Sequence, residues 1–300
     1  PLYSSAASDV YKRQDLHPGF LMLRWIALLA LVACRAKPAP CPPAPAVAPS
    51  GAPLLWRVHK ADGPTVWLFG TIHDAGLPAV QPSVLAALAA SPRFASELGD
   101  NEPDKDAMRE LVRIEHGPGI DQQLPTDDWW DLRDALRGKI REDDLKRARP
   151  WFALIQLNRL SAPKTEAMDV GLAKTARDKK LPVDGLETPE DQARALDSVV
   201  SIEDLAQAIR ARKTMTCAYD GLLTAYAAGD LAALEPMLVV ARTAEPMLYA
   251  RNRRWMPKLE GYLSTSGAFV AVGLGHLVGD HGLPALLAKA GYSVERAPKP

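Results

Sequence analysis

Two histidines in this sequence follow apolar segments at the same short spacing. Residues 66–69 lead into Gly70-Thr71-Ile72-His73, and residues 269–272 lead into Gly273-Leu274-Gly275-His276. A glycine at the end of a strand allows a tight turn, so the histidine three residues later can point into a crevice at the carboxyl edge of a sheet. We therefore expect His73 and His276 to converge on one site.

A carboxylate is expected at the same edge. Glu97 lies in the short apolar segment 94–98, which is typical of a buried strand. One carboxylate beside two imidazoles gives the mixed oxygen and nitrogen ligands that suit Zn, Mn, Fe or Co. The sequence thus predicts a divalent-metal site at His73, Glu97 and His276. In the competing interpretation, the histidines are hydrogen-bonded core or loop residues and Glu97 is a solvated turn acid.

Other catalytic motifs do not fit. The sequence has no Gly-x-Ser-x-Gly elbow, no Walker loop and no His-Glu-x-x-His helix, which disfavours a serine hydrolase, a nucleotidase and a zincin. Gly273 and Gly275 begin a pattern like the dinucleotide fingerprint, but the third glycine, Gly279, comes one position too late. The tetrapeptide Gly-Leu-Pro-Ala occurs at residues 76–79 and 282–285 and hints at an internal duplication.

The composition is that of a globular protein with a sizeable core. The 300 residues are 47% apolar and 24% charged. Because 36 basic residues balance 36 acidic ones, nucleic acid is not an expected partner. The apolar run 25–33 is well short of the roughly 20 residues that span a bilayer, so a polytopic membrane protein is not expected.

The N-terminal region is typical of processing and anchoring signals. Residues 22–33 have the charged start and short apolar stretch of a secretory signal peptide. The ending Leu31-Val32-Ala33-Cys34 resembles the bacterial lipobox, so we expect Cys34 to carry lipid and hold the chain on a membrane. Residues 1–21 are interpreted as a non-native extension. Residues 34–53, rich in proline and alanine, are expected to form an extended tether before a domain at 54–300.

The cysteines do not encode a disulfide framework or a cysteine-type zinc site. Beyond Cys34 there are only Cys41, in the tether, and Cys217, in a helical region. A bridge between Cys41 and Cys217 is conceivable in an oxidising periplasm, but fastening a flexible tether has no evident purpose.

The folded region reads as an α/β domain. Residues 54–59 and 65–72 predict a hairpin around Asp62-Gly63. Further strands are predicted at 181–186, 268–272 and 292–296, and helices at 82–90, 168–179, from 189, through most of 202–263, and at 283–290. Charged amphipathic helices at 106–115, 127–137 and 142–160 predict a helical insertion. We expect a mixed central sheet flanked by helices.

Five motifs, in this order, resemble the TraB/GumN family, which includes the Tiki metalloproteases. They comprise residues 68–73, 94–98, 185–188, 251–252 and 272–279, and the similarity spans about residues 54–298. The resemblance implies a relation to the erythromycin-esterase-like and ChaN-like superfamily, a mixed α/β fold with its active site at one edge of the sheet. It also implies that His73, His276 and Glu97 serve metal-dependent hydrolysis.

Further residues match family positions. Glu187 and Arg251 are expected near the site, although a helix-N-terminal acid and a helix-surface cation are equally good interpretations. Asn252, Asp169 and Trp151 also match and could be structural. His59 and His281 match no family histidine and are expected at the surface. Of the pair at residues 129–130, one tryptophan is expected in the core and the other partly exposed.

The leading hypothesis is a lipid-anchored metallohydrolase of the bacterial envelope acting on a peptide or small ester. A divalent metal (Mn, Co, Zn or Fe) would activate water, Glu97 or Glu187 would accept its proton, and Arg251 would stabilise the oxyanion. The rival is a non-enzymatic protein that binds iron, haem or a peptide in the same crevice. A purely structural lipoprotein would leave the paired histidines unexplained. Arg35 after Cys34 favours the outer membrane, with the domain facing the periplasm.

Overall fold

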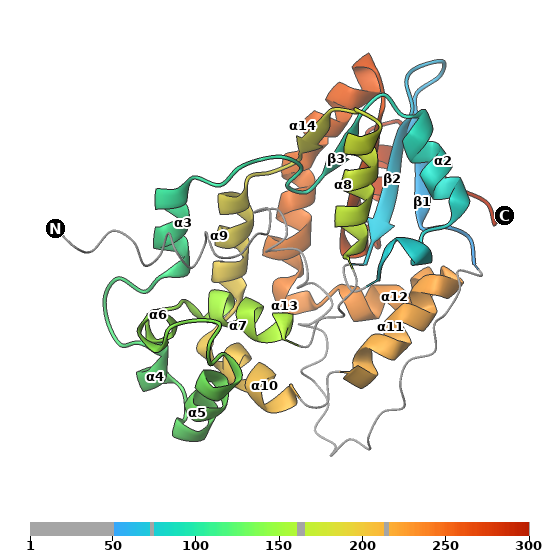
Figure 1. Ribbon diagram of the computed structural model, residues 1–300. Helices are drawn as coiled ribbons and strands as arrows, with labels where there is room; N and C mark the ends of the chain where they lie inside the picture. The colour runs from blue at the N-terminus through green and yellow to red at the C-terminus, as the bar shows by residue number, and fades with distance from the viewer. Residues whose placement is uncertain (1–50, 73–74, 161–165, 213–215, 300) are drawn as a thin grey trace. The chain divides into compact units, whose positions relative to one another are not determined.

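The computed structural model describes residues 51–72, 75–160, 166–212 and 216–299. These residues form two compact units. The first draws on residues 102–160 and 189–212, and the second on residues 51–72, 75–101, 166–188 and 216–299. The first unit is built from helices, and the second holds the sheet (Figure 1).

The α/β unit contains a six-stranded sheet with the order β4-β3-β5-β2-β1-β6. The strands are β1 (Leu55–His59), β2 (Val66–Thr71), β3 (Phe94–Ser96), β4 (Val183–Gly185), β5 (Ala268–Gly273) and β6 (Ser293–Arg296). Neighbours from β4 to β2 are parallel, whereas β1 is antiparallel to both β2 and β6. The expected mixed sheet and the expected hairpin of β1 and β2 are therefore confirmed.

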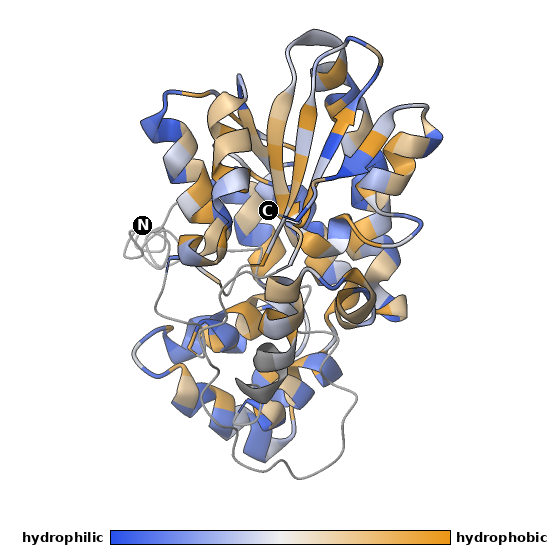
Figure 2. Ribbon diagram, turned by 90° about the vertical axis from the view of Figure 1, so that its right-hand side faces the viewer, coloured by the Kyte–Doolittle hydropathy of each residue, from blue (hydrophilic) through white to orange (hydrophobic). Residues whose placement is uncertain are grey.

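The strand sequences explain their positions in the sheet. All six residues of β5 are buried, as a central parallel strand covered on both faces requires. The edge strand β6 instead alternates exposed and half-buried residues. Figure 2 shows the hydrophobic colouring concentrated along the inner strands.

Helices of the α/β unit cover both faces of its sheet. They are η3 (Leu77–Ala79), α2 (Pro82–Ala90), α8 (Met168–Asp178), α11 (Thr216–Ala228), α12 (Leu231–Leu238), α13 (Ala241–Ala244), the π-helical turn η4 (Glu245–Tyr249), α14 (Ala250–Thr265), the 3₁₀ turn η5 (Leu274–His276) and α15 (Leu283–Lys289). Tyr262 of α14 donates a hydrogen bond to Asp184 of β4. Figure 1 shows α8 on the opposite side of the sheet.

The core of this unit is aromatic at its centre. Phe269 of β5 stacks on Phe94 of β3 with ring centroids 6.2 Å apart, and it lies 6.1 Å from the ring of Phe69 in β2. Each ring is at most 2% exposed. Burial of such a side chain contributes about 1.5–3 kcal/mol, so this cluster helps to hold the three strands in register.

The helical unit has helices that overlap the predicted segments 106–115, 127–137 and 142–160, with non-helical stretches between them, and it includes two later helices. Its elements are α3 (Lys105–Val112), α4 (Ile120–Gln123), α5 (Thr126–Ala135), α6 (Glu142–Lys146), α7 (Pro150–Arg159), α9 (Pro189–Val199) and α10 (Ile202–Ala211). The prediction of one helix across 142–160 is wrong. Arg149 is extended, with ψ 150°, because the residue before a proline is disfavoured in the helical region, so Pro150 starts a new helix.

Two smaller expectations are also met here. Trp129 is buried, whereas Trp130 is 46% exposed. Trp151 is buried and donates its indole N–H to the carbonyl of Leu111, which gives it a structural role within this unit. None of the described helices is both long enough and apolar enough to cross a membrane.

Candidate active site at the carboxyl edge of the sheet

The two Gly-x-x-His segments leave neighbouring parallel strands at one edge of the sheet. Thr71, the last residue of β2, pairs with Gly273, the last residue of β5. His276 then lies in the 3₁₀ turn η5, directly after β5. His73 lies outside the described residues, so its convergence with His276 stays a prediction.

Neither glycine needs the special backbone freedom expected for a tight turn, although a 3₁₀ turn does follow Gly273 directly. Gly273 has an ordinary φ of −51°, and Gly70 is likewise not in the left-handed region. A Cβ at Gly70 would lie only 2.4 Å from the Cδ1 atom of Leu274. Gly70 is therefore needed for close packing, because it lets the turn after β5 cross over the end of β2.

Glu97 and His276 meet in the interior. Glu97 Oε1 lies 3.8 Å from His276 Nε2, and the two residues are 1% and 0% exposed. The backbone N–H of Gly273 donates to the same Glu97 oxygen at 2.9 Å, which fixes the carboxylate against the end of β5. The ring of Trp255 packs 4.4 Å from that of His276. Glu97 is thus not a solvated turn acid.

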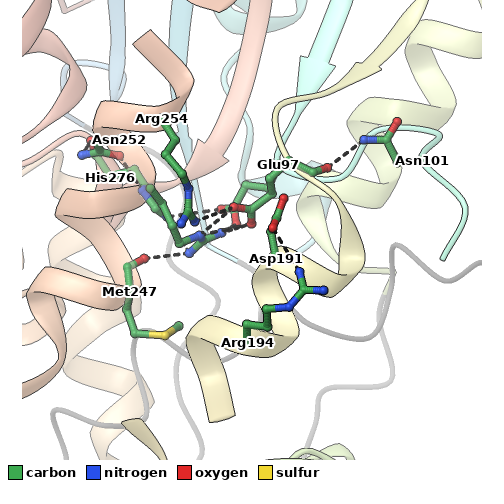
Figure 3. A network of polar contacts seen from close by, with 10 residues as sticks. Glu97, Asn101, Asp191, Arg194, Met247, Asn252, Arg254 and His276 are labelled. Atoms are coloured by element: carbon green, nitrogen blue, oxygen red, sulfur yellow. Dashed lines mark hydrogen bonds and ion pairs between the residues drawn. The ribbon is translucent and has the colours of Figure 1, made fainter. Parts of the chain in front are cut away.

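Arg251 joins these residues into one network (Figure 3). Its Nη2 donates to Glu97 Oε2 and to Glu187 Oε1, both at 2.5 Å. Its Nε donates to the carboxylate of Glu187, and its Nη1 contacts His276 Nε2 at 3.1 Å and the carbonyl of Met247 at 2.7 Å. These contacts use all five N–H groups of the guanidinium. Because Arg251 is 1% exposed, the interpretation as a surface cation is wrong.

Glu187 completes the charged group. Its backbone N–H donates to the carbonyl of Glu97, and its own carbonyl accepts from the Asn101 side chain at 2.7 Å. Burial raises the pKa of the Glu187 carboxyl, and the nearby Arg251 partly opposes this shift. Arg254, about half exposed, lies 4.0 Å from Glu187 Oε2. Glu187 therefore faces the guanidinium groups of both Arg251 and Arg254, and it shares Arg251 with Glu97.

Arg251 is positioned by an irregular helix. The π-helical turn η4 runs directly into α14, and the carbonyl of Met247 within it accepts from Arg251. Such turns are rare and are frequent at functional sites. The helices predicted over 202–263 did not include this turn. Its local signal is Pro246, which lacks the N–H that a regular helix would use there.

The residues present fit a divalent metal only in part. Glu97 and His276 supply one oxygen and one nitrogen ligand of suitable type, close together and buried. Within the described residues no three His, Cys, Asp or Glu side chains are arranged to hold an ion, and His73, the third predicted ligand, lies outside these residues. The contacts of His276 also satisfy the competing interpretation of a hydrogen-bonded core histidine.

The other histidines and motifs considered in the sequence lie outside the Arg251 network. His281 is exposed, as expected, whereas His59 is half-buried in β1. Asp169 lies in the first turn of α8. The two Gly-Leu-Pro-Ala segments play the same local role, since each glycine precedes a helix that has proline in its first turn.

Fold and site together define an α/β protein whose buried acid, base and cation meet at the carboxyl ends of parallel strands. The TraB/PrgY/gumN family model matches residues 54–296, and the chain belongs to this family. Neither a curated protein nor a solved structure matches the chain significantly.

Proposed function

We propose that this chain is a divalent-metal-dependent hydrolase that cleaves a peptide or small ester. The observation that carries the proposal is the buried pair of Glu97 Oε1 and His276 Nε2, which lie 3.8 Å apart just beyond the ends of the neighbouring parallel strands β3 and β5. Burying ionisable groups costs desolvation free energy. A cluster of them at the carboxyl edge of parallel strands is therefore a candidate functional site.

Glu97 and His276 would hold the metal together with His73, and Mn, Co, Zn or Fe would suit these ligands. When bound, the metal would supply Lewis-acid activation of a water molecule. The described part of the site contributes the carboxylate and the imidazole from directions fixed by Gly273 and Asn252.

Glu187 is the better candidate for the general base. Because its pKa is raised, the Glu187 carboxylate is a stronger base, which favours proton transfer from water. Arg251 is placed to stabilise an oxyanion, because its guanidinium already faces both carboxylates. Since its N–H groups are all engaged, a substrate oxygen would have to replace one of the present acceptors.

The proposal places the protein in the bacterial envelope, anchored by lipid on Cys34 and facing the periplasm, with the outer membrane favoured. The support for this arrangement is the signal-like segment 22–33, which is followed directly by Cys34. The structure describes only the domain end of the tether. Arg296 donates to the carbonyls of Ala52 and Pro53, which fastens the chain where it enters the α/β unit. Cys34→Ala should move the full chain from the membrane to the soluble fraction and abolish incorporation of labelled fatty acid.

The catalytic proposal is tested on the detergent-solubilised full chain by metal analysis and by hydrolysis of peptide and ester libraries. His73→Ala, His276→Ala and Glu97→Gln should each lose bound metal and lower kcat/KM by roughly 10²-fold or more. His281→Ala is the matched control, because it removes an exposed imidazole of the same unit.

The outcomes separate the hypotheses. Metal-free protein whose activity is unchanged in His73→Ala, His276→Ala and Glu97→Gln would overturn the proposed site. Tight binding of iron or haem without turnover of any substrate would instead support the binding-protein alternative.

A further inference from the structure

The side chain of Asn252 is fully buried and is held by three contacts. Its Nδ2 donates to the backbone carbonyls of His276, at 3.1 Å, and His281, at 2.9 Å. Its Oδ1 lies 2.6 Å from His276 Nδ1. Figure 3 shows Asn252 beside His276, and the residue is 0% exposed.

These contacts determine where the ring proton of His276 lies. Both carbonyls need the amide hydrogens, so the orientation of the Asn252 amide is fixed and Oδ1 can only accept. His276 Nδ1 must therefore carry the proton. On the other side of the ring, Arg251 Nη1 can only donate, so Nε2 presents its lone pair at 3.1 Å. Two contacts on different ring atoms thus require the same neutral tautomer.

We infer that Asn252 is a positioning residue that keeps His276 in the Nδ1–H form, with the Nε2 lone pair directed toward Glu97 and Arg251. In metal sites the second ring nitrogen commonly donates to a fixed acceptor, which sets both tautomer and ring orientation. The catalytic consequence of this inference rests on the proposed function. The tautomer itself follows from the contacts alone.

A purely structural role for Asn252 makes different predictions. The same amide ties the turn after β5, through the carbonyls of His276 and His281, to α14. If that were its only role, activity would follow stability in every variant. Asn252→Asp and Asn252→Ala separate the two roles, because aspartate keeps the acceptor for Nδ1–H and alanine removes it. Aspartate also turns a carboxylate toward two carbonyl oxygens, so it should destabilise the fold at least as much as alanine.

The test combines ¹⁵N-histidine NMR on the full chain, assigned with His276→Ala, with kinetics and chemical denaturation. We expect the Nδ1–H signature in the wild type and in Asn252→Asp, and a substantial Nε2–H population in Asn252→Ala. For catalysis, kcat should fall by roughly 10- to 100-fold in Asn252→Ala with little change in KM, and by much less in Asn252→Asp. Tyr262→Phe is the control, because it removes another side-chain hydrogen bond of α14, a partly buried one to Asp184 away from His276.

Each outcome has one meaning. An unchanged tautomer in Asn252→Ala would overturn the inference and leave the proposed hydrolase intact. If activity fell only in proportion to stability in Asn252→Asp, Asn252→Ala and Tyr262→Phe, the inference would also be overturned. If the wild type hydrolyses nothing, the proposed function fails, but the NMR comparison still decides the role of Asn252.

Discussion

The buried charged cluster of the α/β unit contrasts with the exposed ion pairs of the helical unit. In the α/β unit, the side chains of Arg251, Glu97 and Glu187 are each at most 3% exposed, and Arg251 Nη2 lies 2.5 Å from an oxygen of each carboxylate. In the helical unit, ion pairs such as Arg137 with Asp134 lie on the surface, with side chains 71% and 56% exposed. The distances are similar, but the surroundings differ completely.

This difference shows that the distance within an ion pair does not reveal whether the pair serves stability or a functional site. Removing a charge from water costs several kcal/mol, and mutual attraction in the interior often does no more than offset that cost. Exposed pairs avoid the cost but are screened by water and salt. The buried cluster is therefore weak evidence for stability and better evidence for a site, whereas the surface pairs of the helical unit suit solubility.

The largest effect on stability is expected from Arg251→Met. The variant leaves Glu97 and Glu187 buried without their shared cation, so the free energy of unfolding should fall by about 3–5 kcal/mol at neutral pH. Chemical denaturation of metal-depleted protein measures this loss. A loss below 1 kcal/mol would show that the cluster is hydrated or differently paired.

The pH dependence of that loss gives an internal check. Arg251 lowers the pKa of Glu187 against the effect of burial, so its removal raises the pKa further. A carboxyl whose pKa is raised in the folded state costs no stability below its unfolded pKa and costs stability as pH rises through the folded pKa. The deficit of Arg251→Met should thus shrink toward acid pH, and adding Glu97→Gln and Glu187→Gln should restore most of the stability at neutral pH.

An intermediate effect is expected from Arg149→Ala in the helical unit. Arg149 pairs with Asp197 at 2.7 Å, and their side chains are 36% and 28% exposed. Removing it should cost about 1 kcal/mol or less, measured by the same denaturation. Partial burial raises the pKa of Asp197, so Asp197→Asn should gain stability relative to the wild type as pH rises above the acid range. The opposite pH trend would contradict this assignment.

The smallest effect is expected from Arg137→Ala. Its partner Asp134 is also contacted by Arg133, and all three side chains have substantial exposure. The denaturation midpoint should not change measurably, because the remaining charges stay hydrated. A loss comparable to that of Arg251→Met would remove the distinction between the two units.

Local signals in the sequence were sufficient for much of the fold. The alternation and apolar runs of β1 and β2 predicted the hairpin, and Pro82 marked the start of α2. A proline also explains the main error, since Pro150 divides the predicted helix over 142–160. These features depend on neighbours a few residues away, which is why composition and spacing reveal them.

The sequence by itself determined which residues could do chemistry, through the two Gly-x-x-His segments and the strand-end position of Glu97. Only the tertiary structure decided that Arg251 is buried and that it joins Glu97, 154 residues away, to Glu187, 64 residues away. Whether a charged side chain lies in water or in the interior depends on the partners that the whole fold brings to it. No local pattern contains that information, because the cost of burial is offset only by contacts distant in sequence.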